Sequence, residues 1–294
     1  MRLRTRGDCI TFQTIKTVVT AMIIDFHTHC FPDAIARRAV DGLSKTGGIT
    51  PHTDGTLGEL KSLMASQNVS FFVVNNISSD ARRQKNVNDF AISSDGGACV
   101  SFGSVHPFAE NAEEELARLK EAGIAGIKFH PYFQDFFVDD ERAFPVYEKA
   151  AELGFIILFH AGCDISFEDT ERAAPERFAK VLDRLESAGI EADIVLAHWG
   201  GSMMTERVIG SLCGRNVYFD TSFGAGNITE EQARRVVKLH GADRILFGSD
   251  CPWHTPLQEK NFIDSLGLGK DAGNKIYYEN AASLLEKHGR KLAR

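Results

Sequence analysis

The sequence lacks several features that would assign it to other classes of protein. No apolar run in its 294 residues approaches the ~20 residues of a membrane-spanning helix, so we expect no membrane partner. The six cysteines are widely scattered and form no CxxC pair, which excludes a zinc knuckle and a disulfide framework. With 40 acidic against 33 basic residues the net charge is −7, which argues against a nucleic-acid partner. We therefore expect reduced thiols, a cytoplasmic location and a small-molecule substrate.

The length and composition suit one large globular domain. Hydrophobic residues make up 43% and charged residues 25% of the chain, and its length is near the roughly 250 residues of a single α/β barrel. Residues 1–21 are basic at their start but lack the uninterrupted apolar core and the cleavage site of a secretory signal. We interpret 1–21 as an N-terminal extension, with Met22 as an alternative start, and 22–294 as the domain. The alternative for 1–21 is an extra strand or hairpin on the barrel floor.

A repeated pattern of strand and helix runs along the chain. Apolar, β-branched or aromatic runs of strand length alternate with segments of helical spacing that end at a glycine, as in "AEEELARLKEAG" and "TEEQARRVVKLHG". The strand runs are continuously apolar, which is typical of parallel strands covered on both faces. The eight predicted strands are 22–27, 69–77, 98–105, 126–130, 155–160, 192–198, 216–221 and 244–250.

Eight parallel strands favour a closed (β/α)8 barrel over an open doubly wound sheet. Neither GxGxxG nor GxxxxGKS/T follows the first strand, which removes the commonest reason to expect a nucleotide-binding sheet. Residues 42–60 are rich in glycine and threonine and are expected to form a long loop over the barrel mouth. Residues 272–289 are expected to form a terminal helix on the outside. The predicted fold class is therefore α/β, a single-domain and slightly distorted TIM barrel.

The first strand ends in "DFHTH", residues 25–29, which places two histidines one residue apart. Alternate side chains of an extended strand share a face, so His27 and His29 are expected to point together. Phe26 and Thr28 are then expected to point away. Two converging neutral imidazoles are typical ligands of a transition metal. The alternative is one hydrogen-bonded core histidine and one exposed histidine.

Further polar residues lie at the carboxyl ends of predicted strands, which form the active-site face of such barrels. Each has a structural alternative: His106 and His130 could bond a neighbouring carbonyl, and Asp250 could start a turn. Lys128 precedes His130 by two residues, so both should point into the barrel, where an unpaired charge is costly. The strand-end set is His27, His29, His106, His130, His160, His198 and Asp250.

Part of this set predicts a metal centre. Three imidazoles and one carboxylate are a normal ligand set for Zn²⁺ with a position left open for water. A bound Zn²⁺ lowers the pKa of that water toward neutrality. Asp250 is then placed to take the water proton and return it to the leaving group, and His198 to polarise the substrate oxygen. The expected ligands are His27, His29, His160 and Asp250.

Six segments between residue 22 and about residue 254 carry a resemblance to a known family: "DFHTH", "GIKFHP", "FHAG", "LAHWGG", "YFDTS" and "LFGSDCPW". In this order they resemble the amidohydrolase superfamily, and within it the amidohydrolase 2 group of metal-dependent TIM-barrel enzymes. That group includes the aminocarboxymuconate-semialdehyde and resorcylate-type decarboxylases. The resemblance implies that the group's two strand-one ligands, strand-five ligand, strand-six histidine and strand-eight aspartate fall on His27, His29, His160, His198 and Asp250.

Lys128 has two interpretations under this resemblance. In members with two metals, a carboxylated lysine at the end of strand four bridges the ions, and His160 and His198 then bind the second ion. In members with one metal, Lys128 and His130 would face the substrate and contact a carboxylate. We expect one Zn²⁺, or another divalent ion such as Mn²⁺, with two ions as the alternative.

The leading functional hypothesis is hydrolysis of a C–O or C–N bond in a small, carboxylated lactone, ester or amide. The first alternative is decarboxylation of an aromatic or enoic acid on the same ligands. A catalytically inactive metal- or ligand-binding barrel is the second alternative, which is disfavoured because every expected ligand position is filled. Proteins of this group are often dimers, so a homodimer is a further expectation.

The remaining candidates concern the substrate pocket. Trp199 and Trp253 either stack on a planar substrate or cover the barrel, whereas Phe31 and Phe133 are interpreted as hydrophobic anchors of their loops. Asp220 is interpreted as a partner that orients a histidine, or as a structural hydrogen-bonder. The candidate substrate-binding residues are His106, Lys128, His130, Trp199 and Trp253.

Overall fold

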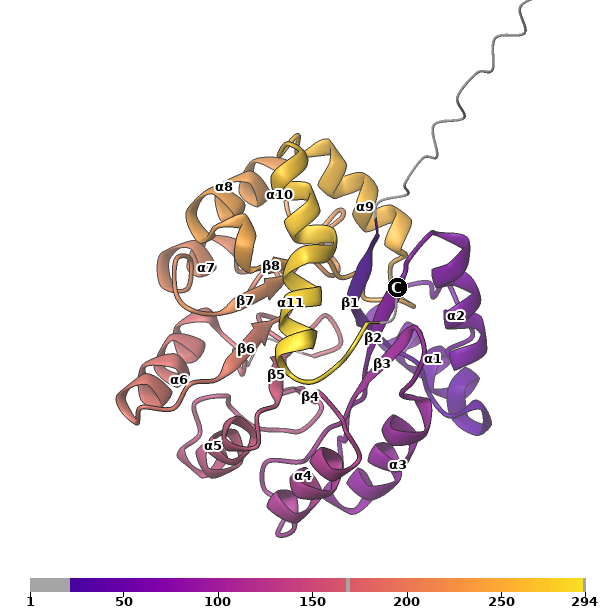
Figure 1. The fold of residues 1–294 in the computed structure, drawn as a ribbon, viewed down its shortest axis with the longest axis vertical. Coiled ribbons are helices and arrows are strands. Elements are labelled where there is room, and N and C mark those ends of the chain that lie inside the picture. The colour runs from indigo at the N-terminus through magenta and orange to yellow at the C-terminus, as the bar shows by residue number, and fades with distance from the viewer. Residues whose placement is uncertain (1–21, 168–169, 293–294) are drawn as a thin grey trace, which may run out of the picture.

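The computed structural model describes residues 22–167 and 170–292, so the predicted extension 1–21 lies outside the described residues. The chain alternates parallel strands with helices, and the helices surround the strands (Figure 1). The strands are β1 (Ile24–Thr28), β2 (Phe71–Asn75), β3 (Cys99–Phe102), β4 (Gly126–Phe129), β5 (Ile156–Phe159), β6 (Asp193–Leu196), β7 (Tyr218–Asp220) and β8 (Ile245–Leu246). All eight predicted strands are confirmed.

The strands close into a barrel through two ladders and two single bridges. One ladder runs β1-β2-β3 and the other β4-β5-β6-β7-β8. Gly103, just after β3, pairs in parallel with Ile127 in β4, and Thr28 in β1 pairs in parallel with Cys251 after β8. The TIM barrel is therefore confirmed. Its distortion lies at these two junctions, where the regular pairing shrinks to one bridge.

The helices start and end at residues with clear capping roles. Thr229 and Thr255 each form a capping box with the glutamine three residues later, at the starts of α8 and α9. Gly123 and Gly189, just after α4 and α6, adopt the left-handed conformation that ends a helix. The α-helices are α1 (Asp33–Gly47), α2 (Leu57–Ser66), α3 (Gln84–Ser94), α4 (Ala112–Glu121), α5 (Phe144–Glu152), α6 (Pro175–Ser187), α7 (Thr205–Ser211), α8 (Glu230–His240), α9 (Pro256–Ser265), α10 (Lys270–Asn274) and α11 (Asn280–Lys287). Short 3₁₀ helices occupy η1 (Ala81–Arg83), η2 (Glu141–Ala143) and η3 (Ala242–Arg244), and η4 (Lys275–Glu279) is a π-helix.

The prediction of a long loop over 42–60 was wrong. Its first part belongs to α1 and its last part to α2, which leaves only 48–56 between the two helices. The glycine and threonine content misled the prediction because two of these residues are helix boundaries. Gly48 is the left-handed C-cap of α1, and the Thr56 side chain accepts the Glu59 N–H at 3.2 Å as the N-cap of α2.

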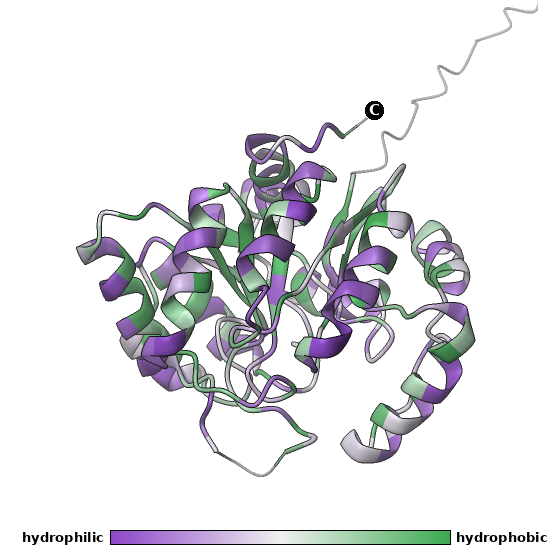
Figure 2. Cartoon of the chain, turned by 90° about the horizontal axis from the view of Figure 1, so that it is seen from below, coloured by the Kyte–Doolittle hydropathy of each residue, from purple (hydrophilic) through white to green (hydrophobic). Residues whose placement is uncertain are grey.

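Apolar residues pack on both sides of the barrel wall, and Figure 2 shows the hydrophobic strands inside a shell of amphipathic helices. Between strands and helices, the ring of Phe129 stacks on that of Phe159 at 5.3 Å, and Tyr147 of α5 packs edge-on against both. Inside the barrel the packing is equally close, because a Cβ on Gly126 would lie 2.6 Å from the Phe102 ring. The interior is therefore a filled core.

The predicted terminal helix over 272–289 is confirmed as the run α10, η4 and α11. Ala281, Leu284 and Leu285 of α11 join the interior cluster of the barrel together with Ile24 at the start of β1. The helix crosses the end of the barrel where the strands begin (Figure 1). The strand carboxyl ends, which carry the candidate site, lie at the opposite end.

The prediction that Phe26 points away from the barrel interior, which followed from strict alternation along β1, was wrong. The β1–β2 register shifts between Asp25 and Thr28, and Phe26 lies in the interior cluster with its ring edge-on to Phe102 at 5.7 Å. Both Phe26 and His27 are thus directed inward, because the irregular strand end breaks the period of two. Among residues 22–167 and 170–292, none of the helices has the length and apolar composition needed to cross a bilayer.

Candidate active site

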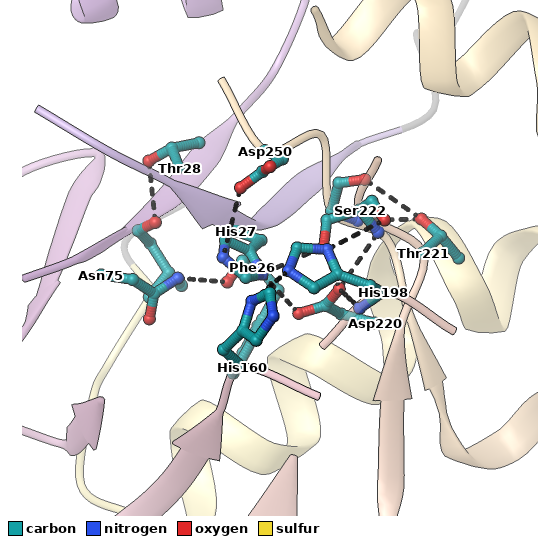
Figure 3. Close-up of polar contacts among 12 residues, drawn as sticks. Phe26, His27, Thr28, Asn75, His160, His198, Asp220, Thr221, Ser222 and Asp250 are labelled. Carbon is teal, nitrogen blue, oxygen red and sulfur yellow. Dashed lines mark hydrogen bonds and ion pairs between the residues drawn. The ribbon is translucent and has the colours of Figure 1, made fainter. Parts of the chain in front are cut away.

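The two histidines of β1 converge on the carboxylate that follows β8. His27 Nε2 and His29 Nε2 lie 3.4 Å and 3.3 Å from the same oxygen, Asp250 Oδ1 (Figure 3 shows His27 beside Asp250). Asp250 is held there by its own N–H, which donates to the His27 carbonyl at 2.8 Å. Residue 250 adopts a left-handed φ of 69°, a conformation that non-glycine residues accept only when neighbouring contacts fix it.

The Nδ1 atom of each β1 histidine donates a hydrogen bond to the protein. His27 Nδ1 donates to Asp220 Oδ2 at 2.7 Å, and His29 Nδ1 donates to the Asn75 carbonyl at 2.8 Å. These partners assign both tautomers, because a carbonyl or an ionised carboxylate only accepts. The two Nε2 atoms therefore present lone pairs, and they face a carboxylate oxygen with no proton between them. A cation is the group that satisfies such a cluster of acceptors.

A second chain of hydrogen bonds fixes the histidines of strands five and six. His198 Nδ1 lies 3.3 Å from the Ser222 carbonyl and 2.9 Å from Ser222 Oγ, so it carries the proton. His198 Nε2 then accepts a hydrogen bond that His160 Nδ1 donates at 3.0 Å. His160 Nε2 is left as a lone pair, and it is buried with no hydrogen-bond partner among the described residues. An unsatisfied buried nitrogen in a cavity wall marks a ligand position.

Burial and neighbouring charges keep the imidazoles of His27, His130 and His160 in their neutral form. Burial and the charge of Lys128 lower the pKa of His27 to about 4. Burial, with the facing histidines and Lys128, holds the pKa values of His130 and His160 well below the usual range. For Asp250, burial alone would raise the pKa, but whenever the facing histidines carry a proton the hydrogen bond from His29 and the charges of His27 and His198 outweigh burial and lower the pKa. The site therefore offers neutral nitrogens and an ionised oxygen.

Lys128 is fully buried beside the β1 histidines. Its Nζ lies 3.3 Å from His27 Nε2, and burial lowers the pKa of the ammonium to about 8. Asp220 and Asp250 oppose this shift and keep a charged amine tolerable there. Both prior interpretations of Lys128, a cation for a substrate carboxylate and a carboxylated bridge, are compatible with this position.

In the described part of the chain, three groups of side chains bring potential ligand atoms within 4.8 Å of one another: His27 with His29 and Asp250, His27 with His198 and Asp220, and His130 with His160 and Asp164. The second group is already joined by hydrogen bonds through Asp220 and Ser222. In the third, His130 Nδ1 accepts the Phe133 N–H and His130 Nε2 lies 3.3 Å from Asp164 Oδ2, so this nitrogen donates. Only the first group presents lone pairs that face one another.

The predicted ligand set is thus brought together in part. The structure joins His27, His29 and Asp250, whereas His160 does not fall within 4.8 Å of all three. His160 instead bonds His198 and stacks on His130, with ring centroids 4.3 Å apart. It still lines the same cavity through its unpaired nitrogen.

A cavity of about 680 Å³ opens above this cluster. Lys128, His130 and Trp253 line it, as predicted for substrate-binding residues, and Phe31 and Phe133 line it as well. The two aromatic rings were interpreted only as loop anchors, so their position in the cavity wall is new.

His106 and Trp199, two of the candidate substrate-binding residues, lie outside the cavity lining in the described part of the chain. His106 Nδ1 accepts the Phe108 N–H at 3.2 Å, a local bond of another kind than the carbonyl bond that was its structural alternative. Trp199 is turned outward into the core between barrel and helices, where it packs edge-on against Phe262 at 6.2 Å. Its neighbour His198 faces the site, and both residues have left-handed backbones.

The family described as Amidohydrolase (Amidohydro_2) matches residues 24–287. The chain belongs to this amidohydrolase family. Amidohydrolases of this family are typically dependent on a divalent metal, and the neutral histidines and Asp250 offer a ligand group of the matching chemistry. The chain is therefore a metal-dependent amidohydrolase-family enzyme. No curated protein matches the sequence.

Solved structures confirm the barrel of this amidohydrolase. An uncharacterised TIM-barrel protein from Bordetella bronchiseptica superposes with a TM-score of 0.72 at 19% identity, over 92% of this chain and 100% of that chain. A 5-carboxyvanillate decarboxylase from Sphingomonas paucimobilis gives 0.64 at 16% identity, over 91% and 99%. A Pseudomonas putida protein provisionally described as a 2-pyrone-4,6-dicarboxylic acid hydrolase gives 0.62 at 16%, over 92% and 99%. At these identities the likeness concerns the fold.

Sequence reasoning missed several residues of the amidohydrolase site. Asp164 pairs with His130 from a loop that no strand pattern marks, and burial raises the pKa of its carboxyl. Ser222 links His27, His198 and Asp220, yet only its place two residues after Asp220 in "YFDTS" could have signalled it. Asp220 does orient a histidine, as one of its two interpretations predicted.

Proposed function

We propose that this amidohydrolase hydrolyses a C–O or C–N bond of a lactone, ester or amide that also carries a carboxylate. The observation that carries the proposal is the pair of lone pairs on His27 Nε2 and His29 Nε2 that face one oxygen of Asp250. These three residues would hold a divalent ion, with His160 Nε2 in the same cavity as the expected fourth ligand. A Zn²⁺ or Mn²⁺ held there supplies Lewis-acid chemistry and a water of lowered pKa.

The chain's own residues would carry the proton. Asp250 is ionised and lies at the strand-eight rim, so its carboxylate would accept a proton from the attacking water. The water oxygen adds to the carbonyl carbon, the C–O or C–N bond breaks, and Asp250 returns the proton to the leaving oxygen or nitrogen. His198 would stay hydrogen-bonded to Ser222 through Nδ1, and it would polarise the substrate oxygen from strand six once its Nε2, which accepts from His160 in the present structure, takes up a proton. Lys128, which lines the cavity, would attract the substrate carboxylate.

Decarboxylation is the second candidate, because the fold is shared with an enzyme named as a decarboxylase. In that reaction a C–CO₂⁻ bond breaks, CO₂ leaves, and Asp250 or His198, after taking up a proton from solvent, donates it to form the new C–H bond. Both reactions use the same ligand group. Only hydrolysis places a water oxygen in the product.

Reaction in ¹⁸O-labelled water separates the candidates on one panel of carboxylated lactones, amides and aromatic acids. Hydrolysis is expected to give product with one ¹⁸O atom, whereas unlabelled product with release of CO₂ would select decarboxylation. Asp250→Asn should abolish turnover, and Thr46→Ala, at an exposed position on α1, is the matched control. Equal activity of wild-type and Asp250→Asn protein loaded with the same metal would refute both mechanisms.

Metal analysis tests the ligand assignment independently of turnover. We expect one ion per chain, retained by His198→Ala and lost in His27→Ala and His29→Ala. Two ions per chain, together with an added mass of CO₂ on Lys128, would replace the one-metal assignment with the bridged alternative.

A further inference from the structure

The cavity is larger than a one-ring acid needs. Its volume of about 680 Å³ lies within the range of roughly 300–1,000 Å³ that is typical of pockets for drug-sized ligands. The candidate metal ligands and Lys128 meet at its floor, and further polar side chains, among them Arg83 and Asn86, also line the cavity. A small substrate bound at the floor would leave the outer part of the cavity to water.

The outer part is bounded by apolar side chains from two helices and from the loop after the first of them, here called the apolar wall: Ile35, Ala39, Leu43, Ile49, Val87 and Phe90. On α1 the positions 35, 39 and 43 are four residues apart and share one face. On α3, Val87 and Phe90 are three apart and likewise share a face. Both faces line one cavity, and α1 and α3 lie on the same side of the barrel (Figure 1).

Packing of the protein accounts for only part of this wall, because Phe90 packs against the outer core but the α1 residues of the wall do not belong to the buried face of their helix. The buried face of α1 is formed by Ala36 and Val40, which are 0% and 2% exposed. Ile35, in contrast, is 40% exposed, and Leu43 and Phe90 are half-buried. A contiguous set of apolar side chains that stay partly accessible within a pocket costs free energy in water and marks a ligand-binding surface.

We infer that the substrate carries an apolar tail, an alkyl chain or a second ring, that extends from its reacting carboxylated head and lies against the apolar wall. The position of the head rests on the proposed function, since the head is placed at Asp250 and Lys128. The tail is assigned by the wall alone. Affinity then depends on tail length, because each buried methylene is worth a factor of about three to four.

Binding of non-reacting acids tests the tail without requiring turnover. Benzoate, 4-butylbenzoate and 4-octylbenzoate are titrated into zinc-loaded protein below their micelle concentrations, with heat as the readout and Trp253 fluorescence as a second signal. Trp253 lines the cavity, whereas Trp199, the second tryptophan of the chain, is buried away from it. We expect the dissociation constant to fall by at least tenfold from benzoate to 4-butylbenzoate and again to 4-octylbenzoate. Equal constants for the three acids would overturn the inference.

Two variants assign the effect to the wall. Leu43→Ser and Ile35→Ser should weaken 4-octylbenzoate at least fivefold and leave benzoate unchanged. Ile35→Ser keeps the test valid if Leu43→Ser fails to fold, because Ile35 is already 40% exposed. Leu239→Ser on α8 is the matched control, since Leu239 is 50% exposed and outside the cavity lining. An unchanged constant for 4-octylbenzoate in both wall variants, or an equal loss for both acids, would contradict the assignment.

The same samples separate this inference from the proposed function. Metal content and ¹⁸O incorporation report on the head group, and the slope of affinity against tail length reports on the wall. A length dependence that is lost in the wall variants but occurs in a protein without hydrolytic activity would refute the hydrolase and keep the tail. Hydrolysis of short substrates by a protein whose affinity does not depend on tail length would keep the hydrolase and refute the tail.

Discussion

Replacing Asp220 by asparagine should weaken the candidate metal centre, because it should move the proton of His27 from Nδ1 to Nε2, the nitrogen assigned to the metal. Asp220 Oδ1 accepts the N–H groups of His198 and Ser222, each at 3.0 Å, as well as the Ser222 hydroxyl. These three donors hold the amide oxygen of the introduced asparagine in the Oδ1 position. The amide NH₂ must then face His27 Nδ1, which is 2.7 Å from the present Oδ2.

An NH₂ group can only donate, so His27 Nδ1 becomes an acceptor and its proton moves to Nε2. That nitrogen faces Asp250 Oδ1 at 3.4 Å and is the lone pair assigned to the metal. Loss of a partner that orients a metal-bound histidine typically costs roughly 10- to 100-fold in metal affinity. We therefore expect Asp220→Asn to weaken zinc binding by about 1.4–2.7 kcal/mol.

Zinc affinity is measured by competition with a chromophoric chelator at about pH 7.5, well above the lowered pKa of His27, on wild-type and Asp220→Asn protein whose folding is checked by circular dichroism. Asp193→Asn is the matched control, because Asp193 Oδ2 also accepts a histidine nitrogen, His288 Nε2 at 2.7 Å, but at the start of β6. The control should bind zinc as wild type does. Unchanged zinc affinity in folded Asp220→Asn would refute the tautomer assignment and with it the metal position.

Three further outcomes are expected. Gly162→Ala should destabilise the fold by about 2–4 kcal/mol in urea unfolding, because the added Cβ would lie 2.1 Å from Ser202 N at a residue with a φ of +81°. Gly226→Ala is the control: its φ of +84° is similar but its Cβ would enter open space, so it should cost only about 1–2 kcal/mol. Equal losses in the two variants would contradict the steric argument. Burial lowers the pKa of His240 to about 4, below its unfolded value near 6.5, so the folded state prefers the neutral ring and stability should be lost as the pH falls from 6.5 to 4, by at most about 3 kcal/mol. A His240→Gln protein should show a shallower loss over that interval, and an identical profile would rule His240 out as its source. Removal of metal by EDTA should lower the melting temperature, and zinc at about 100 times its dissociation constant should restore about 2.7 kcal/mol of unfolding free energy. A melting temperature that changes with neither EDTA nor zinc would argue against a bound ion.

The sequence by itself determined the order of elements and the end of the barrel that carries the chemistry. Continuous apolar runs marked all eight strands, and polar residues directly after them had to meet at one rim because parallel strands end together. The convergence of His27 and His29 followed from their spacing. Even so, the local rule failed for Phe26, where the shifted register of β1 overrides strict alternation.

Only the tertiary structure decided which strand-end residues act together and in which protonation state. The lone pair on His160 depends on a chain that passes through His198 to Ser222, residues separated by up to 62 positions along the sequence. His106 and Trp199 sit at strand ends as His130 and His198 do, but one bonds its own loop and the other turns into the outer core. Hydrophobic spacing predicts that a helix has an apolar face, but whether that face meets the core or a cavity is set by the packing of distant elements. The apolar wall of α1 and α3 could therefore be found only from the folded chain.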